Sequence, residues 1–261
     1  MDTYEDRDVT LRIGRERVRL QLRIPKAPLS LPDFLPIVAA LTDLTVAVAG
    51  REAQDAGRPV RCGPRCGACC RQLVPISPPE AIRLRATVAK LDPDHRGRVL
   101  DRFEAIKRRL ADEGLATPVR TAFRPQDGDR PDRRTVGLAY FALGLACPFL
   151  EEESCSIHPD RPLACREYLV SSDPIGCTGA AGAEPVMIVE VPRRLSALFA
   201  LLSHRLLADR FGPTPTWLAL VEALDEKRFD TPAVVGFSLP GPELFDRLLQ
   251  RLAEPPGAGS Q

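Results

Sequence analysis

The chain has 261 residues, enough to bury a hydrophobic core as one large domain or as one domain with appendages. Its formal net charge is +1, so no global electric field draws it to nucleic acid or to an anionic membrane. We see no apolar run that approaches the roughly 20 residues of a transmembrane helix. We therefore expect a soluble, cytoplasmic protein that has neither nucleic acid nor a membrane as its partner.

The N-terminal region alternates apolar and polar residues on both sides of a short turn. Residues 9–13 and 18–24 alternate in this way, with Gly14 between them, which predicts a β-hairpin with one buried face. After a proline-punctuated stretch, apolar residues at helical spacing predict a helix over residues 37–55. Gly57 is expected to end this helix.

Two further helices are predicted from their start signals. The segment Ser77-Pro-Pro-Glu80 combines an N-cap serine, proline in the first turn and a capping-box glutamate, so a helix is expected from there to about Leu91. Asp92 or Asp94 is expected to cap the next helix, which ends at Gly114.

The second half of the chain is predicted to be mostly helical outside its cysteine-rich part. Residues 124–134 form a polar loop, and residues 186–191 form a short strand. Helices are expected over 195–211, within 213–229 and over 242–252.

All eight cysteines lie in two windows of the chain. In the first window four thiols fall within nine residues, among glycines that allow a positive φ or a close backbone approach. Short turns of this kind aim several sulfur atoms at one point, as a tetrahedral thiolate site or an iron–sulfur cluster requires. The cysteines are Cys62, Cys66, Cys69 and Cys70 in the first window and Cys147, Cys155, Cys165 and Cys177 in the second.

Three other interpretations of the cysteines are weaker. Cysteines that act as small hydrophobic residues would be scattered through apolar stretches, whereas these lie among Gly, Pro and Arg. A disulfide framework needs an oxidising compartment, and a bond between the adjacent Cys69 and Cys70 would be strained. A thioredoxin-like redox pair of Cys66 and Cys69 would leave six thiols without a role. A metal site is therefore preferred.

Eight thiolates allow more than one metal arrangement. They satisfy two four-coordinate ions, one four-iron cluster with a further site, or a shared cluster to which Cys69 and Cys70 both contribute. Two sites would concentrate a formal charge of about −4, which nearby guanidinium groups can offset, although these arginines also reflect an arginine-rich composition. His158 is a further candidate ligand, with a supporting or packing role favoured. The arginines beside the cysteines are Arg61, Arg65, Arg71, Arg161 and Arg166.

Together these motifs resemble the YkgJ-type cysteine-cluster family, a zinc- or iron-chelating domain. The match covers roughly residues 60–180 and places His158 where the family usually has an aromatic residue. The resemblance implies that all eight cysteines are candidate ligands. The shared elements are the knuckle from Cys62 to Cys70, the Cys147-Pro-Phe-Leu segment, the segment from Cys155 to Arg166, and the final Cys177.

The same resemblance supplies an enzymatic alternative. One branch of the family is known as flagellin lysine N-methylases, so a protein-lysine N-methyltransferase or an oxidoreductase is an alternative function. The spacing Cys62-x3-Cys66-x2-Cys69 is also that of radical S-adenosylmethionine enzymes, although these use a βα barrel. A methyltransferase needs an apolar, nucleoside-sized pocket against the cluster, walled by helices of 77–114 and 195–229. A third alternative is a zinc-stabilised interaction module.

We therefore expect an α+β fold that is mostly helical, with an N-terminal β-hairpin and an irregular cysteine-rich metal-binding core. The cofactor is an iron–sulfur cluster or zinc, with iron preferred because Pro148 follows Cys147, as in bacterial ferredoxin runs, and because the adjacent pair suits a multinuclear centre. The sequence identifies neither a catalytic residue nor a substrate or protein partner. The expected segments are 1–58 (hairpin and helix), 59–180 (metal-binding domain), 181–254 (helical region) and 255–261 (disordered tail).

Overall fold

The computed structural model describes residues 3–63, 65–123, 132–179, 184–212, 214–224 and 232–253. Helices dominate these ranges and an antiparallel hairpin opens them, so the predicted α+β, mostly helical class is confirmed. The predicted loop over 124–134 and the predicted tail over 255–261 lie largely or wholly outside the described residues.

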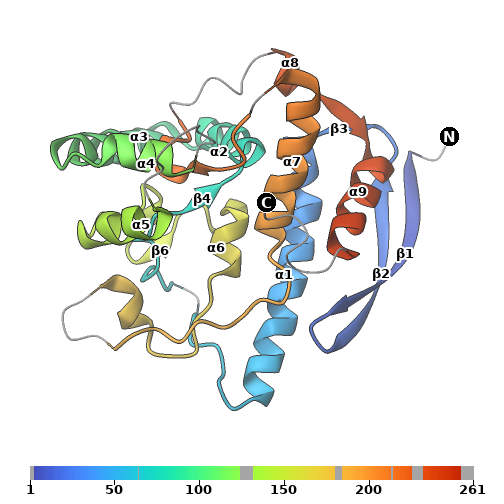
Figure 1. Ribbon diagram of the computed structural model, residues 1–261, viewed down its shortest axis with the longest axis horizontal. Coiled ribbons are helices and arrows are strands. Elements are labelled where there is room, and N and C mark those ends of the chain that lie inside the picture. The colour runs from blue at the N-terminus through green and yellow to red at the C-terminus, as the bar shows by residue number, and fades with distance from the viewer. Residues whose placement is uncertain are drawn as a thin grey trace.

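Two long helices form the centre of the molecule. Helix α1 (Leu31–Asp55) and helix α7 (Leu195–Phe211) lie side by side, with the hairpin and α9 (Gly241–Ala253) on one flank (Figure 1). The shorter helix α6 (Leu163–Glu167) contacts both central helices. The opposite flank consists of α2 (Pro78–Lys90), α3 (Pro93–Asp112), α4 (Ala116–Ala122) and α5 (Arg133–Ala142).

The N-terminal hairpin forms as predicted. Strand β1 (Tyr4–Ile13) pairs antiparallel with β2 (Glu16–Pro25), and their side chains alternate between exposed and partly buried. Gly14 opens the turn at φ +54°, and a Cβ atom there would lie 2.5 Å from the Glu52 carboxylate. The Arg15 N–H donates to Glu52 Oε1 at 2.6 Å, which docks the turn on α1.

Helix α1 begins at Leu31 rather than at residue 37, so the proline-punctuated stretch opens the helix instead of preceding it. The Ser30 hydroxyl accepts the Asp33 N–H at 3.2 Å and caps the first turn. Pro32 lies in that turn, where a backbone N–H has no helical partner to lose. Gly57, at φ +72°, follows the helix end as predicted.

By length and composition, α1 is the one described helix that could cross a membrane, which corrects the expectation that no apolar run approaches that length. Its fully buried side chains, among them Phe34, Val38 and Val48, belong to the interior of the fold. The helix contacts α2, α6 and α7. It therefore occupies the position of a core helix, which meets the same length and hydropathy criteria.

Helices α2 and α3 begin at the predicted signals. Asp92 caps α3 by accepting the His95 N–H at 2.9 Å, and Gly114, at φ +69°, follows its end. The segment 213–229 is different, because its described part contains strand β7 (Leu218–Ala219) and a 3₁₀ turn instead of the predicted α-helix. A tertiary contact explains the difference. Strand β7 pairs with β4 (Pro75–Ile76), so the backbone groups of β7 bond to a distant segment instead of to a helix of their own.

Two smaller pairings complete the chain's β-structure in the described ranges outside the cysteine windows. Strand β3 (Pro28–Ser30) pairs with β8 (Ser238–Pro240), next to the start of α9. The strand predicted over 186–191 is reduced to a single antiparallel bridge between Val170 and Ile188. Helices α7 and α9 lie where they were predicted.

Buried carboxylates join α2, α6 and α7. Glu80 accepts the Ser77 N–H at 2.8 Å and, across the fold, the Leu163 N–H at 2.9 Å where α6 begins. Glu167, at the end of α6, accepts the Ser196 N–H at 3.0 Å in the first turn of α7. Each carboxylate therefore satisfies helix N-terminal donors that have no partner within their helix. Burial raises the pKa of both carboxyl groups.

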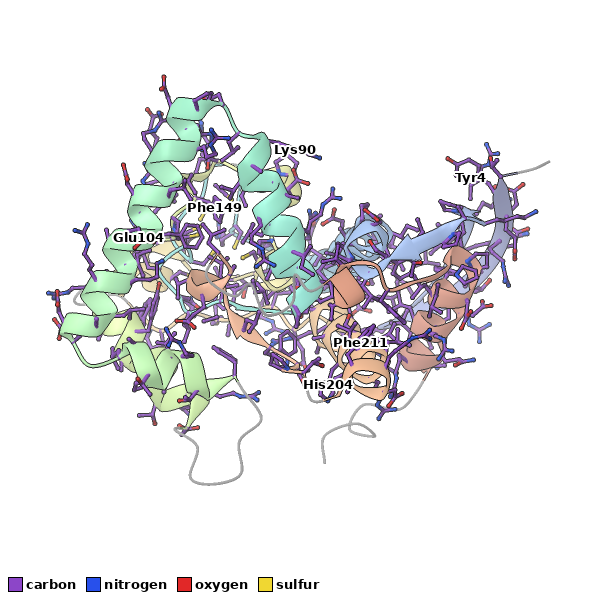
Figure 2. All side chains as sticks on the ribbon, turned by 90° about the horizontal axis from the view of Figure 1, so that it is seen from above. Tyr4, Lys90, Glu104, Phe149, His204 and Phe211 are labelled. Atoms are coloured by element: carbon purple, nitrogen blue, oxygen red, sulfur yellow. The ribbon has the colours of Figure 1, made fainter. Side chains whose placement is uncertain are left out.

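One hydrophobic core draws on all three predicted segments. It includes Phe34 from the first, Phe103 and Phe149 from the second, and Phe199 and Phe245 from the third. The Phe103 and Phe149 rings meet edge to face with centroids 5.6 Å apart, and Figure 2 shows Phe149 between α2 and α3. The boundaries at 58 and 180 stay predictions, but the described segments pack as one unit.

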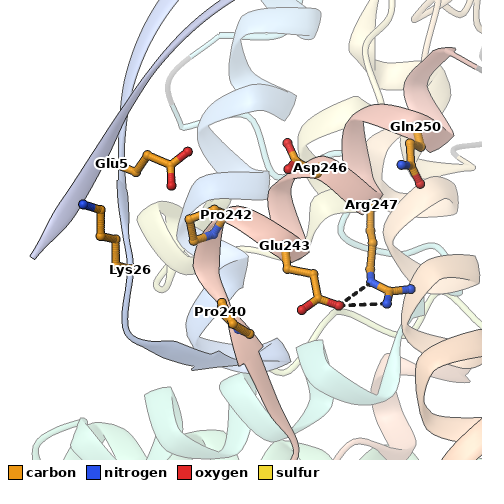
Figure 3. A pocket seen from close by; sticks show the side chains of 8 residues that line it. All are labelled: Glu5, Lys26, Pro240, Pro242, Glu243, Asp246, Arg247 and Gln250. Carbon is orange, nitrogen blue, oxygen red and sulfur yellow. Dashed lines mark hydrogen bonds and ion pairs between the residues drawn. The ribbon is translucent and has the colours of Figure 1, made fainter.

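An open groove of about 670 Å³ lies between the hairpin and α9 (Figure 3). Glu5 and Lys26 line one side, and Asp246 lies opposite with the ion pair between Glu243 and Arg247. Its described lining is made of charged and polar side chains and prolines, without cysteine. The groove is therefore separate from the cysteine chemistry.

We expect Glu80→Gln to lower the free energy of unfolding by about 1–3 kcal/mol at acidic pH, because the amide leaves one buried N–H without an acceptor. Burial raises the pKa of Glu80 in the native protein above the ordinary 4.5. As pH rises, the native protein therefore keeps the proton of the Glu80 carboxyl group up to a higher pH than the unfolded protein does. The stability advantage of wild type over the variant should therefore shrink as pH rises from about 4.5 toward the native pKa. Chemical denaturation at several pH values measures this.

Glu16→Gln is the matched control, because a hydrogen bond from Arg51 lowers the pKa of this exposed carboxyl. Its contribution to stability is present above the ordinary pKa and is lost as pH falls, which is the opposite sign. A difference between wild type and Glu80→Gln that stays constant from pH 4.5 to neutrality would contradict the role given to Glu80.

Candidate metal centre

The first cysteine window is a pair of tight turns. The Cys66 N–H donates to the Gly63 carbonyl at 3.2 Å, and the Cys70 N–H donates to the Gly67 carbonyl at 2.9 Å. The positive φ expected of the knuckle glycines occurs instead at Arg65, which adopts a left-handed conformation with φ +64°. These turns place the four cysteines within nine residues of the chain.

The second window is held by short, regular pieces. Strand β5 (Leu150–Glu151) pairs with β6 (Ser154–Cys155), and the two turn residues Glu152 and Glu153 both have positive φ, as in a two-residue hairpin. Helix α6 carries Cys165. A 3₁₀ turn, η2 (Pro174–Thr178), carries Cys177.

The two windows meet in space, which confirms the convergence that metal binding by both would require. The Cys147 N–H donates to the Cys70 carbonyl at 2.6 Å. A Cβ atom on Gly67 would lie 2.7 Å from the Glu153 carbonyl oxygen, so only glycine permits this approach. Arg71 adds an ion pair of 2.6 Å to the Glu153 carboxylate.

The last cysteine also returns to the first window. Cys177 is buried in a small apolar cluster with Ala68 and Val170, against which Cys62, Cys66 and Cys69 pack. The Val170 N–H donates to Cys62 Sγ at 3.3 Å.

All eight cysteines are free thiols, and several are held in their neutral form by burial. Burial, followed by the charge of neighbouring thiols, raises the pKa of Cys147 to about 12 and that of Cys177 to about 11. Burial also raises the pKa of Cys165 well above its ordinary value. Cys70 donates an S–H hydrogen bond to the Cys69 sulfur, which lowers the pKa of Cys69 and raises that of Cys70.

Backbone and arginine donors favour the thiolate form at particular sulfurs. Burial raises the pKa of Cys147 and Cys155, and the N–H groups of Phe149 and Ile157, which bond to the sulfurs two residues earlier, offset part of that rise. Arg161 acts in the same direction on Cys69 and Cys155. Arg102 does so on Cys147. Such donors are what a metal–thiolate centre needs to spread its negative charge.

The donor set fits a thiophilic metal, although the side chains are not in a closed polyhedron. Among the residues that the structure describes, no group of three or more His, Cys, Asp and Glu side chains is arranged to hold an ion. The backbone brings the thiols together, and closing a site requires rotation of cysteine side chains about their Cα–Cβ bonds. Zinc and iron–sulfur clusters both accept all-thiolate coordination.

His158 and the predicted arginines divide into different roles. His158 is exposed, and the charges that act on it come from Arg161, Arg166 and Asp43. Arg166 is buried and pairs with Asp43 at 2.8 Å, so it serves the attachment of α6 to α1. Arg102 was missed, because it lies on α3, far in sequence from either window; it donates to the Pro148 carbonyl at 3.2 Å.

A cavity of about 280 Å³ lies beside the cysteine-bearing segment. Its walls are α1, α2 and residues 159–166, so it shares only α2 with the pocket that a methyltransferase would need between 77–114 and 195–229. Its volume is just below the range of about 300–1,000 Å³ typical of ligand pockets. Arg83, Arg161, Asp43 and Asp160 bring both signs of charge to it.

Residues 61–178 match the family model CxxCxxCC, described as a "putative zinc- or iron-chelating domain". The matched stretch contains all eight cysteines, and it agrees with the resemblance expected over residues 60–180. No curated protein and no solved structure matches the chain.

We expect Gly67→Ala to destabilise the protein by about 1–3 kcal/mol, because its methyl group would force the two windows apart. Gly63→Ala is the matched control, since a Cβ atom there meets nothing within 4 Å. Thermal and chemical denaturation of both variants measure the difference. Equal stability of the two variants would show that the close approach at Gly67 is not needed.

Proposed function

We propose that this chain, whose residues 61–178 belong to the CxxCxxCC zinc- or iron-chelating family, is a metal-binding protein with all eight cysteines as ligands. The observation that carries the proposal is the meeting of the two windows: the Cys147 N–H donates to the Cys70 carbonyl at 2.6 Å, and Cys62, Cys66 and Cys69 pack against the cluster of Cys177. In keeping with this geometry, the Cys69 sulfur acts electrostatically on six other thiols drawn from both windows. The six are Cys62, Cys70, Cys147, Cys155, Cys165 and Cys177.

Without a cation, ionising thiols gathered in this way is unfavourable, because burial and mutual repulsion raise most of their pKa values. A bound metal stabilises the thiolates, so their ionisation becomes favourable when the metal binds. A bound zinc ion would cross-link the windows, and an iron–sulfur cluster would add electron transfer. Arg161, Arg102 and the backbone N–H groups described above would hold the negative charge of the centre.

The preference for iron rests on Pro148 after Cys147 and on the adjacent pair Cys69 and Cys70. Such a pair suits a multinuclear centre. We further propose a reducing, cytoplasmic location, which is consistent with eight free thiols.

Anaerobic purification followed by metal and acid-labile sulfide analysis tests the proposal. We expect bound metal at one or more equivalents per chain, with iron and sulfide together if the centre is a cluster and zinc without sulfide otherwise. Folded protein that contains no metal and takes up neither Zn²⁺ nor iron with sulfide would contradict metal binding.

We expect Cys69→Ser to lower the amount of bound metal per chain, because the Cys69 sulfur acts electrostatically on thiols of both windows. Ser156→Ala is the control in the second window, since the Ser156 hydroxyl has no hydrogen-bond partner among the described residues. The control should keep wild-type metal content. Wild-type metal content in Cys69→Ser, with intact helical circular dichroism, would remove Cys69 from the centre.

A further inference from the structure

We propose that the eight thiols form two adjacent four-sulfur metal sites, with Cys69 and Cys70 serving different sites. This inference rests on the proposed metal binding and assigns each ligand. Site A consists of Cys62, Cys66, Cys69 and Cys177, and site B consists of Cys70, Cys147, Cys155 and Cys165.

Packing separates site A from the other cysteines. Its four members gather in one small apolar cluster with Ala68 and Val170. The backbone of Val170 also bonds to the start of the first window. Its N–H donates to Cys62 Sγ, and its carbonyl accepts the Arg61 N–H at 2.8 Å. Three thiols from the first window thus share an enclosure with the last cysteine of the chain.

Site B lies against the main hydrophobic core instead. Cys147 and Cys155 pack on that core. Leu150 links them, because its N–H donates to the Cys147 carbonyl at 2.9 Å and it pairs with Cys155 in the β5–β6 hairpin. The Cys70 carbonyl accepts the Cys147 N–H, which brings Cys70 to this side of the knuckle. Cys165 enters from α6, whose first N–H is held by the buried Glu80 carboxylate.

The electrostatic neighbours of each thiol follow the same division. Cys62 and Cys66 both act on Cys177, and Cys147 and Cys165 both act on Cys70. Cys69 is the exception, since it acts on members of both sets. Because Cys69 and Cys70 are adjacent in the chain, the two sites share a boundary at this pair.

The rival assignment follows the order of the chain and places one metal in each window. That assignment would pair Cys70 with Cys62, and Cys177 with Cys155. The packing contradicts both pairings. Cys177 is enclosed with cysteines of the first window, and the Cys70 carbonyl accepts a hydrogen bond from the Cys147 N–H. In the proposed division each metal takes three ligands from one window and one from the other, so each cross-links the two windows.

Anaerobic titration of the reduced, metal-free full-length chain with Co²⁺ tests the division, because tetrahedral cobalt–thiolate absorption counts the sites. Wild type should bind about two equivalents, as two four-thiolate sites require. Cys66→Ser combined with Cys177→Ser removes two ligands from site A only and should keep one equivalent. Cys155→Ser combined with Cys177→Ser damages both sites and should lose both. The assignment by windows requires the reverse order for these two double variants.

A second measurement uses wild-type protein and so does not depend on the folding of variants. The chain is loaded with one equivalent of Zn²⁺, alkylated, and mapped by mass spectrometry. We expect protection in the two proposed sets, with Cys177 following Cys62 and Cys66, and Cys70 following Cys147.

The outcomes separate this inference from the proposed function. Wild type that binds neither Co²⁺ nor Zn²⁺ would contradict metal binding itself. One equivalent in wild type, the reverse order in the double variants, or protection by windows would overturn the division while leaving metal binding in place.

Discussion

The close approach of two backbone segments underlies the cysteine chemistry of this protein. The Cys147 N–H reaches the Cys70 carbonyl at 2.6 Å, and the absence of a side chain at Gly67 leaves room for the Glu153 carbonyl. A hydrogen bond between main-chain groups uses no cysteine side chain, so this contact holds the windows together through the backbone and leaves the thiols available to a metal.

Buried carboxylates hold together the helices that support this contact. They accept hydrogen bonds from helix N–H groups that a purely hydrophobic core would leave without partners. Glu80 reaches from α2 to the first turn of α6, and Glu167 reaches from α6 to the first turn of α7. Both carboxyl groups are removed from water, which raises their pKa, but each receives several donors from helix N-termini. Cys165 lies between these two anchors on α6, so its position depends on both.

Charge near the thiols follows from the same packing. Arg102 comes from α3, and its charge opposes the rise that burial causes in the pKa of Cys147. Arg161 comes from the turn before α6, and its charge adds to the hydrogen bond from Cys70 that lowers the pKa of Cys69. Arg166, next to Cys165 in the chain, instead forms an ion pair with Asp43 of α1. Sequence proximity to a cysteine therefore does not decide which guanidinium group serves the centre, because helix geometry sends neighbouring side chains to different faces.

The sequence by itself determined the elements whose signals are local. The hairpin around Gly14, the capped starts at Ser77 and Asp92 and the amphipathic α9 depend on turn chemistry, capping and periodicity, which act over a few residues. The spacing of the cysteines likewise indicated a metal-binding domain, and the family match over residues 61–178 agrees with it. Tertiary structure decided the rest. Leu218 and Ala219 pair with the strand before α2, and residues 220–222 form a 3₁₀ turn instead of the predicted α-helix. Cys177 joins the first window instead of its own. Both outcomes depend on contacts between segments far apart in the chain.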